Sequence, residues 1–237
     1  MPTSHDVRVE ESPRRVRGTA GGAIVIDTTR PLFVWDRPSY PHYYVARADV
    51  DESLLVEGDE PGVFDLVVGS TTEKGAARVG SAPELSGHLH FRWDALDHWF
   101  EEDEEVFVHP RDPYKRVDIL RSSRRVRVEI GGVELADTTG ASFLYETGLP
   151  VRYYLPKTDV RFRHLTPSAR ETACPYKGVA RYWNVEVGGA VHPDVVWGYD
   201  FPVPESQRIA GLVCFYNEKV DIYLDEVKQE RPSTPFG

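Results

Sequence analysis

The side chains that could do chemistry gather in one short segment, residues 172–183. It contains the thiol of Cys174, the phenol of Tyr176 and the ammonium group of Lys177. An ammonium group close to a cysteine favours the thiolate, so Cys174 or Tyr176 could be the reactive group of an enzyme. Cysteine is also among the most commonly buried residues and packs as a small hydrophobe. The segment alone is therefore consistent with catalysis and with a purely structural turn.

Lys177 has an acidic candidate partner in Glu146, with Asp200 as the alternative acid or base. A carboxylate and an ammonium group could form an acid/base couple in an active site. They could equally form an internal salt bridge that does no chemistry. Both interpretations of the pair stay open.

A binding pocket is the second interpretation of the same region. Aromatic side chains suit a pocket wall because they combine apolar area with a polar handle, and they suit a β-domain core just as well. Lys177, with Arg181 or Arg163, would hold an anionic or polar group of the ligand. The expected ligand-binding residues are Lys177, Tyr154, Arg181, Trp183, Trp197 and Asp200.

Histidines suggest a rival site in the first half of the chain. His88 and His90 are two residues apart and would share one face of a strand. With His98 and Glu101 they could bind a transition metal. A solvated strand face explains the same pattern, and we expect no metal site.

The elements that position these residues occur twice. The string Arg-Arg-Val-Arg at residues 14–17 recurs 110 positions later at residues 124–127, and a glycine pair and Asp-Thr-Thr follow both copies. The same spacing holds through the tyrosine pairs at residues 43–44 and 153–154. The chain therefore contains an internal duplication, which predicts two domains. We expect them at about residues 14–120 and 121–228, with flexible tails at residues 1–13 and 229–237.

The two copies differ around the chemical segment. After a change in spacing, the sequence aligns Lys74 with Lys177 and Trp93 with Trp197. A lysine kept in both copies favours a structural role for it. Only the second copy carries Cys-Pro-Tyr before the lysine, so any site is expected there.

Short segments rich in Val, Tyr, Phe and Trp, separated by turn residues, predict antiparallel sheets. Residues 125–130 alternate charged and apolar side chains, a glycine pair turns the chain, and the alternation resumes, which predicts a β-hairpin. Only short helices are expected, at residues 95–100 and 206–209. The predicted fold is all-β: two tandem copies of a small antiparallel β-sheet domain, packed as an intramolecular pseudo-dimer.

Composition excludes several classes of function. A net charge of -10 argues against nucleic acid as a partner, since phosphate binding needs a basic surface. No apolar stretch is long enough to span a membrane and the N-terminus lacks a signal-peptide core, which predicts a cytoplasmic protein. Two cysteines, Cys174 and Cys214, cannot build a four-thiolate zinc site, and a disulfide between them is not expected in a reducing compartment.

The second copy closely resembles a bacterial domain-of-unknown-function family. That family is marked by the motif Thr-x-Cys-Pro-Tyr-Lys-Gly-x-Ala-x-Tyr-Trp, which occurs here at residues 172–183. The resemblance covers the second copy and only the opening hairpins and a remnant of the first. It implies a small, mostly β domain and no known chemistry. The family's nucleotidyltransferase-like label finds no support in a chain without a glycine-rich phosphate loop or paired-aspartate metal motif, and we expect no cofactor.

Three hypotheses of function follow. We favour the binding of a small polar or anionic metabolite in an aromatic-lined pocket of the second copy. The alternatives are an enzyme acting on a small molecule and a protein interaction module. An enzyme needs titratable groups that converge on one cavity, whereas an interaction module needs an exposed apolar patch.

Overall fold

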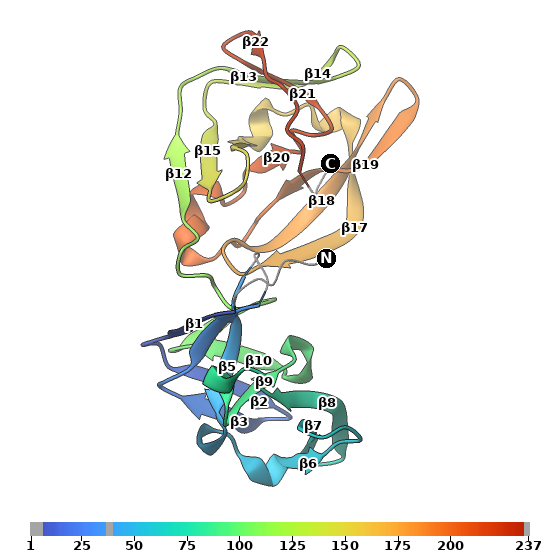
Figure 1. Cartoon of the computed structure of the whole chain (residues 1–237). Helices are drawn as coiled ribbons and strands as arrows, with labels where there is room; N and C mark the ends of the chain where they lie inside the picture. Colours follow the sequence, from blue (N-terminus) through green and yellow to red (C-terminus); the bar gives the residue numbers. More distant parts are fainter. Residues whose placement is uncertain (1–6, 37–39, 235–237) are drawn as a thin grey trace, which may run out of the picture. The chain divides into compact units, whose positions relative to one another are not determined.

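The chain folds into two separate units of nearly identical design (Figure 1). The structure is a computed structural model and describes residues 7–36 and 40–234. Tertiary contacts divide the chain into a first unit, Met1–Asp112, and a second unit, Pro113–Gly237. Across the described residues every helical segment is a short 3-10 helix, and none is long and apolar enough to cross a membrane. The all-β prediction is therefore confirmed.

Each unit contains one sheet of seven strands and one of four, all pairs antiparallel. The large sheet of the second unit has the order β12 (Val117–Arg121), β15 (Ser142–Glu146), β16 (Arg152–Leu155), β20 (Val213–Phe215), β19 (Ala190–Gly198), β18 (Gly178–Val187) and β17 (Leu165–Cys174). Its small sheet has the order β14 (Val133–Thr138), β13 (Val126–Ile130), β21 (Asp221–Leu224) and β22 (Val227–Lys228).

The first unit repeats this plan strand by strand. Its large sheet has the order β1 (Arg8–Glu11), β4 (Leu32–Trp35), β5 (His42–Ala46), β9 (His88–Phe91), β8 (Thr71–Val79), β7 (Val63–Val68) and β6 (Leu55–Glu57). Its small sheet has the order β11 (Glu104–Val106), β10 (His98–Glu101), β2 (Val16–Ala20) and β3 (Ala23–Thr28). β1 thus corresponds to β12, β7 to β18, and β8 to β19.

Alternation along the strands builds the core of each unit. In β13, Val126, Val128 and Ile130 are buried while the intervening residues are half-exposed. These side chains join Phe143, Phe215 and others from the large sheet in one buried cluster, so the two sheets of the unit pack face to face. An equivalent cluster fills the first unit.

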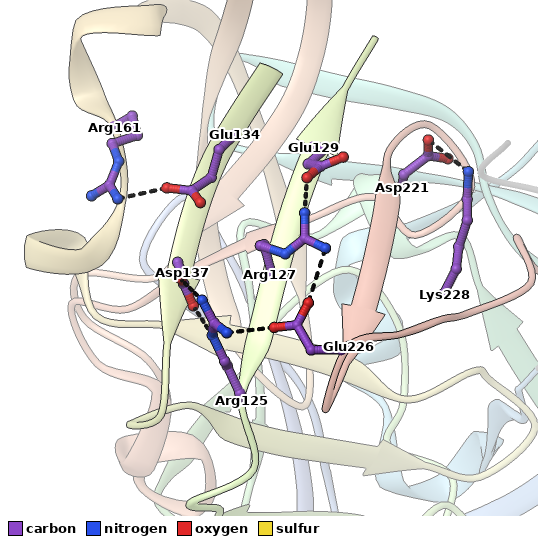
Figure 2. A network of polar contacts seen from close by, with 9 residues as sticks. All are labelled: Arg125, Arg127, Glu129, Glu134, Asp137, Arg161, Asp221, Glu226 and Lys228. Atoms are coloured by element: carbon purple, nitrogen blue, oxygen red, sulfur yellow. Dashed lines mark hydrogen bonds and ion pairs between the residues drawn. The ribbon is translucent and has the colours of Figure 1, made fainter. Parts of the chain in front are cut away.

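The residues repeated between the copies hold each unit together. Arg125 binds both carboxylate oxygens of Asp137, at 2.8 and 2.5 Å. Its counterpart Arg15 binds Asp27 in the same way, at 2.7 and 2.6 Å. In the second unit further ion pairs extend this contact across the small sheet, through Glu226 and on to Arg127 (Figure 2). The repeated arginines already have carboxylate partners, which explains their retention without any ligand.

The structure corrects two expectations about boundaries. Residues 8–11, expected in a flexible tail, form β1, because this strand completes the large sheet of the first unit beside β4. β12 begins within the expected first domain, at Val117, but it pairs with β15 and belongs to the second unit. Residues 1–6 and 235–237 of the expected tails lie outside the described residues.

Of the two predicted helices, one is confirmed and one is wrong. Residues 204–209 form a 3-10 helix, η7 (Pro204–Ile209), as expected. The helix predicted at residues 95–100 is wrong, because Trp99 pairs with Gly18 and with Val106 inside the small sheet. Trp99 is a buried core residue, and strand pairing overrides the weak local preference.

The strand register also corrects the alignment of Lys74 with Lys177. Lys74 lies inside β8, whereas Lys177 immediately precedes β18, which corresponds to β7. Trp93 lies beyond β9 in a 3-10 helix, η4 (Trp93–Ala95), whereas Trp197 lies in β19, so these two residues do not correspond either. Lys177 therefore has no lysine counterpart in the first unit.

The same register locates the true difference between the copies in one hairpin. Pro167 pairs with Trp183 in the second unit, and Glu57 pairs with Phe64 in the first. Sixteen positions separate the first pair and seven the second, so the β17–β18 hairpin contains nine additional residues. The chemical segment lies in this extension.

Both units carry a β-bulge next to this hairpin. The backbone N–H of Gly75 donates to the side chain of Asp65 at 2.8 Å, and that of Asp194 donates to the side chain of Asn184 at 3.0 Å. Gly75 and Asp194 both have positive φ, 58° and 53°. The bulged residue is thus held by a side-chain oxygen from the neighbouring strand in each unit.

Candidate functional site

The large sheet of the second unit has an outer face, opposite the core, that carries a second buried cluster. This outer aromatic cluster comprises Ile119, Leu144, Tyr154, Ala180, Tyr182, Trp197, Tyr199, Ile209, Cys214 and Tyr216. Tyr154 is 1% exposed, and its hydroxyl accepts a hydrogen bond from the Trp197 indole at 3.2 Å. Two of the expected pocket residues, Tyr154 and Trp197, are thus brought together here by packing.

Trp183 is separated from these residues by strand geometry. Successive side chains of a strand point to opposite faces, so Tyr182 joins the outer aromatic cluster and Trp183 turns to the other face. There its ring packs against the core, meets Phe162 edge to face, and lies 5.5 Å from the Lys157 ammonium group. The expected pocket wall is divided between two faces of one sheet.

Lys177 and Glu146 form a buried ion pair beside the outer aromatic cluster. The Lys177 Nζ atom lies 2.5 Å from Glu146 Oε2, and the two side chains are only 11% and 9% exposed. The predicted pairing is therefore present. The ion pair joins the turn of the β17–β18 hairpin to the end of β15. Neither β17 nor β18 is a neighbour of β15 in the sheet. The ammonium group is engaged by the carboxylate.

The turn that carries Cys174 and Tyr176 is fixed by backbone contacts. The Lys177 N–H donates to the Cys174 carbonyl at 3.3 Å, and Gly178 adopts a φ of 100° that favours glycine. The hydroxyl of the fully buried Ser206, in η7, donates to the Tyr176 carbonyl at 2.8 Å. Cys174 is half-buried, so its thiol is not enclosed in the core.

Titratable groups do converge near this turn. Burial raises the pKa of the Tyr199 phenol well above its usual value, and the neighbouring Cys174, Tyr182 and Glu146 raise it further. Burial likewise raises the pKa of Tyr154, with Tyr199 beside it. Both phenols are therefore neutral near pH 7 and act as hydrogen-bonding groups of the cluster.

A second buried ion pair borders the cluster. Both guanidinium Nη atoms of Arg152 bind Glu218 at 2.7 Å, and the side chains are 8% and 2% exposed. Burial alone would raise the pKa of the Glu218 carboxyl, but hydrogen bonds from Arg152 and Thr234 hold it at about 2. The guanidinium group also lies 5.6 Å from the Trp197 ring and 5.7 Å from that of Tyr216. The charges of Arg152 and Glu218 are therefore balanced within the pair.

Arg181 and Asp200, both expected to contact a ligand, lie outside the buried cluster. The Arg181 side chain is 66% exposed and lies 3.4 Å from Glu171 and 3.9 Å from Asp200. Asp200 lies closer to Lys157, at 3.1 Å. These charges balance one another at the surface.

The second unit has a cavity of about 800 Å³ on the same outer face. It is lined by Leu120, Arg121, Gly140, Ser142, Pro156, Arg208, Ala210 and Leu212. Ser142 is the cross-strand neighbour of both Arg121 and Tyr154, so the cavity adjoins the outer aromatic cluster. None of the expected ligand-binding residues lines it.

Two guanidinium groups and no carboxylate line this cavity. Arg208 donates to the Ile119 carbonyl at 3.0 Å, which positions its side chain over β12. Among the residues that the structure describes, neither Arg121 nor Arg208 has a carboxylate within ion-pair distance. The cavity therefore concentrates positive charge in a protein whose net charge is -10.

Sequence reasoning missed Arg121 and Arg208 because neither lies in the chemical segment. A signal for Arg121 was present: extending the 110-residue offset by three positions before the Arg-Arg-Val-Arg string aligns it with Glu11, a reversal of charge. Arg208 lies beyond the region in which the two copies keep the 110-residue spacing, so its counterpart can be found only from the strand register.

The histidines considered as a rival metal site are dispersed. His90 lies in β9, whereas His98 lies in β10 of the other sheet and binds Glu105 at 2.7 Å. Glu101 accepts hydrogen bonds from Tyr43 at 2.6 Å and from Arg14 at 2.7 Å. Within residues 7–36 and 40–234, no group of three or more His, Cys, Asp or Glu side chains is arranged to hold a metal ion.

Comparison with known proteins gives a family and no activity. No curated protein matches the chain. Residues 8–63 and 118–226 match the family described as a domain of unknown function, DUF427, which also carries the label NTP_transf_9. The two matched segments begin at β1 and at β12, the strands that open the large sheets of the two units. The chain therefore belongs to the DUF427 family of domains of unknown function.

Proposed function

We propose that the second unit binds a small anionic molecule, carrying a carboxylate or phosphate group, in the cavity between β12, β15 and η7. The observation that carries this proposal is a cavity of about 800 Å³ with two guanidinium groups and no carboxylate in its lining. This volume lies within the range of about 300–1,000 Å³ that is common for small-molecule sites.

The chemistry of arginine supports an anionic ligand. A guanidinium group presents a planar fork of donors that matches the oxygens of a carboxylate or phosphate. Arg208 uses one Nη atom for the Ile119 carbonyl, which holds the side chain in place and leaves its other donors for a ligand. Leu120, Pro156 and Leu212 would contact an apolar part of the same molecule.

The residues first expected to bind the anion have a supporting role in this proposal. Lys177 is neutralised by Glu146, and Arg181 lies between two carboxylates, so neither supplies the unbalanced positive charge. The ion pair of Lys177 instead fixes the extended hairpin against β15, which also forms one wall of the cavity. This pairing also argues against catalysis by Cys174 or Tyr176, because Lys177 is occupied by Glu146 and is not free to favour a thiolate.

The test is a thermal-shift and calorimetric screen of inorganic phosphate and small carboxylates against the full chain. We expect binding by the wild type, and binding weaker by at least about a hundredfold in Arg121→Gln/Arg208→Gln, because each charge-assisted hydrogen bond contributes about 1.5–3 kcal/mol and this variant removes two guanidinium groups.

Arg116→Gln/Arg231→Gln is the matched control. It removes the same charge from exposed arginines that pair with Asp118 and Asp221, outside the cavity lining. Binding should survive in this variant. The proposal fails if no anion binds the wild type, or if both double variants bind it equally well.

A further inference from the structure

The first unit contains a cavity of about 500 Å³ on the outer face of its own large sheet. It is lined by Val9, Glu11, Arg30, Leu32, Ala46, Glu84 and His88. These residues come from β1, β4, β5, β9 and the 3-10 helix η3 (Pro83–Leu85), or lie directly beside them. The corresponding elements of the second unit line the arginine cavity.

The strand register shows that the two cavities are equivalent residue by residue. Glu11 pairs with Leu32 at the edge of the first sheet, as Arg121 pairs with Ser142 at the edge of the second. Leu32 and Ser142 are the counterparts on β4 and β15, since they pair with the matching tyrosines, Tyr44 and Tyr154. Glu11 therefore occupies the position of Arg121.

The pairing of the corresponding strands β9 and β20 identifies the counterpart of the second cavity arginine, Arg208. Leu89 pairs with Val45 as Val213 pairs with Leu155, which sets a spacing of 124 between the copies. This spacing aligns the buried Leu85 of η3 with the fully buried Ile209 of η7, so the two helices anchor in the same way. It also aligns Glu84 with Arg208.

Two charged positions of the cavity are therefore reversed between the units, whereas a third, Arg30 of the first cavity, has the uncharged Gly140 as its counterpart. We propose that these two positions decide the sign of the ligand charge that the cavity accepts, so that Arg121 and Arg208 admit an anion and Glu11 and Glu84 exclude it. The inference rests on the proposed function, because it explains which of two equivalent cavities takes the anion.

The physical argument is one of like-charge repulsion. An anion that enters the first cavity meets two carboxylates that have no ion-pair partner among the described residues, and only one guanidinium group, that of Arg30, opposes them. Placing like charges together in a partly desolvated site costs more than a missing contact, so specificity comes from repulsion as well as attraction. The wall positions Leu32 and Ala46 of the first cavity correspond to Ser142 and Pro156 of the second, and none of these four side chains carries a charge.

The test is a gain of function, measured by calorimetry with inorganic phosphate and with citrate on the full chain. The wild type should bind one anion per chain. Glu11→Arg/Glu84→Arg should bind two, the second at an affinity within about tenfold of the first. Arg121→Glu/Arg208→Glu should bind none, and the fourfold exchange should bind one again.

Glu11→Gln/Glu84→Gln is the matched control, because it removes the repulsion without supplying donors, and its first cavity should bind the anion at least about tenfold more weakly than that of the arginine variant. Circular dichroism and unfolding temperature establish that each variant is folded. A folded Glu11→Arg/Glu84→Arg protein that still binds only one anion overturns the inference.

The two proposals fail in different ways. If the wild type binds no anion, the proposed function is wrong, while the gain of a site in Glu11→Arg/Glu84→Arg would still support the charge rule. If wild type and variant both bind none, both proposals are wrong.

Discussion

The two units of this chain have one strand order and one set of repeated ion pairs, yet they differ sharply in one hairpin and in the charges of one cavity. The repeated contacts, such as Arg15 with Asp27 and Arg125 with Asp137, lie in the small sheets. The differences lie on the large sheets. The comparison teaches that residues kept in both copies specify the fold, whereas residues changed at equivalent positions show where the surfaces of the two units differ.

The largest expected effect concerns the two lysines that the sequence aligns and the structure separates. Lys177→Ala leaves the Glu146 carboxylate buried without its partner, which costs about 3–5 kcal/mol of unfolding free energy. Lys74 pairs with Asp65, whose side chain is 6% exposed. The Lys74 side chain is 74% exposed and Asp65 also accepts a hydrogen bond from the Gly75 N–H, so Lys74→Ala should have a smaller effect. Denaturant unfolding of the two variants measures the difference.

A double variant sharpens this comparison. Glu146→Leu/Lys177→Met removes both charges and should recover much of the stability lost in Lys177→Ala, because no unpaired charge remains. Equal losses in Lys74→Ala and Lys177→Ala would show that the buried pair does not distinguish the second unit.

The next effect is a different response of the two units to acid. Burial lowers the pKa of His90 from 6.5 to about 4, so its contribution to stability is complete above pH 6.5 and is lost as the pH falls towards 4. The pKa of Glu218 is lowered from 4.5 to about 2, so its contribution is complete above pH 4.5 and is lost as the pH falls towards 2. Each shift corresponds to at most about 3 kcal/mol.

Hydrogen exchange followed by mass spectrometry resolves the two units. Protection in the first unit should fall between pH 6.5 and 4, before that in the second. His42 stacks on His90 at 4.8 Å, and Asp36 and Arg78 also act on its charge, so His90→Gln should flatten the first transition without abolishing all pH dependence. Simultaneous loss of protection in both units would contradict this order.

A smaller effect concerns one position that is His90 in the first unit and Cys214 in the second. Burial disfavours charge in both cases: it lowers the pKa of the imidazole and raises that of the Cys214 thiol to about 12. Cys214 should therefore resist a thiol reagent at pH 8 in the native protein, while the half-buried Cys174 reacts. Mass spectrometry of the labelled protein identifies the site, and modification of Cys214 first would refute the expectation.

The smallest effect should be the same in both units. Arg15 and Arg125 form exposed bidentate pairs, with side chains 41% and 46% exposed, so Arg15→Ala and Arg125→Ala should each lower the unfolding temperature only slightly. Thermal unfolding at low and high salt checks this. A large loss in one unit alone would mean that the repeated pair does not play the same role twice.

Much of the fold could be predicted from the sequence because its signals are local. Alternation around Val126 and the glycine pair that follows predict the β13–β14 hairpin correctly. The predicted helix at residues 95–100 failed because the pairing of Trp99 is a contact between distant parts of the chain. Residues 8–11 look like a tail for the same reason: their partner strand begins 21 residues later.

The candidate site was less accessible to sequence reasoning. The pairing of Glu146 with Lys177 was foreseen from residue types, and the structure places both side chains in contact. The alignment of Lys74 with Lys177 was wrong because it relied on a short run of similar residues around each lysine. The order of the strands in the sheet separates the two lysines, and that order is not visible in the sequence. The arginine cavity depends on Arg208, whose counterpart Glu84 becomes evident only when β9 is set against β20.

The bulge beside the long hairpin shows how a local choice of amide or acid decides what else the chain must contain. Asp65 and Asn184 offer the same oxygen to the bulged backbone, but only the aspartate adds a charge, and Lys74 balances it at 2.5 Å. The lysine that resembles a remnant of a functional motif thus compensates for the charge of Asp65. Exchanging Asp65 for asparagine should therefore make Lys74 dispensable for the stability of the first unit.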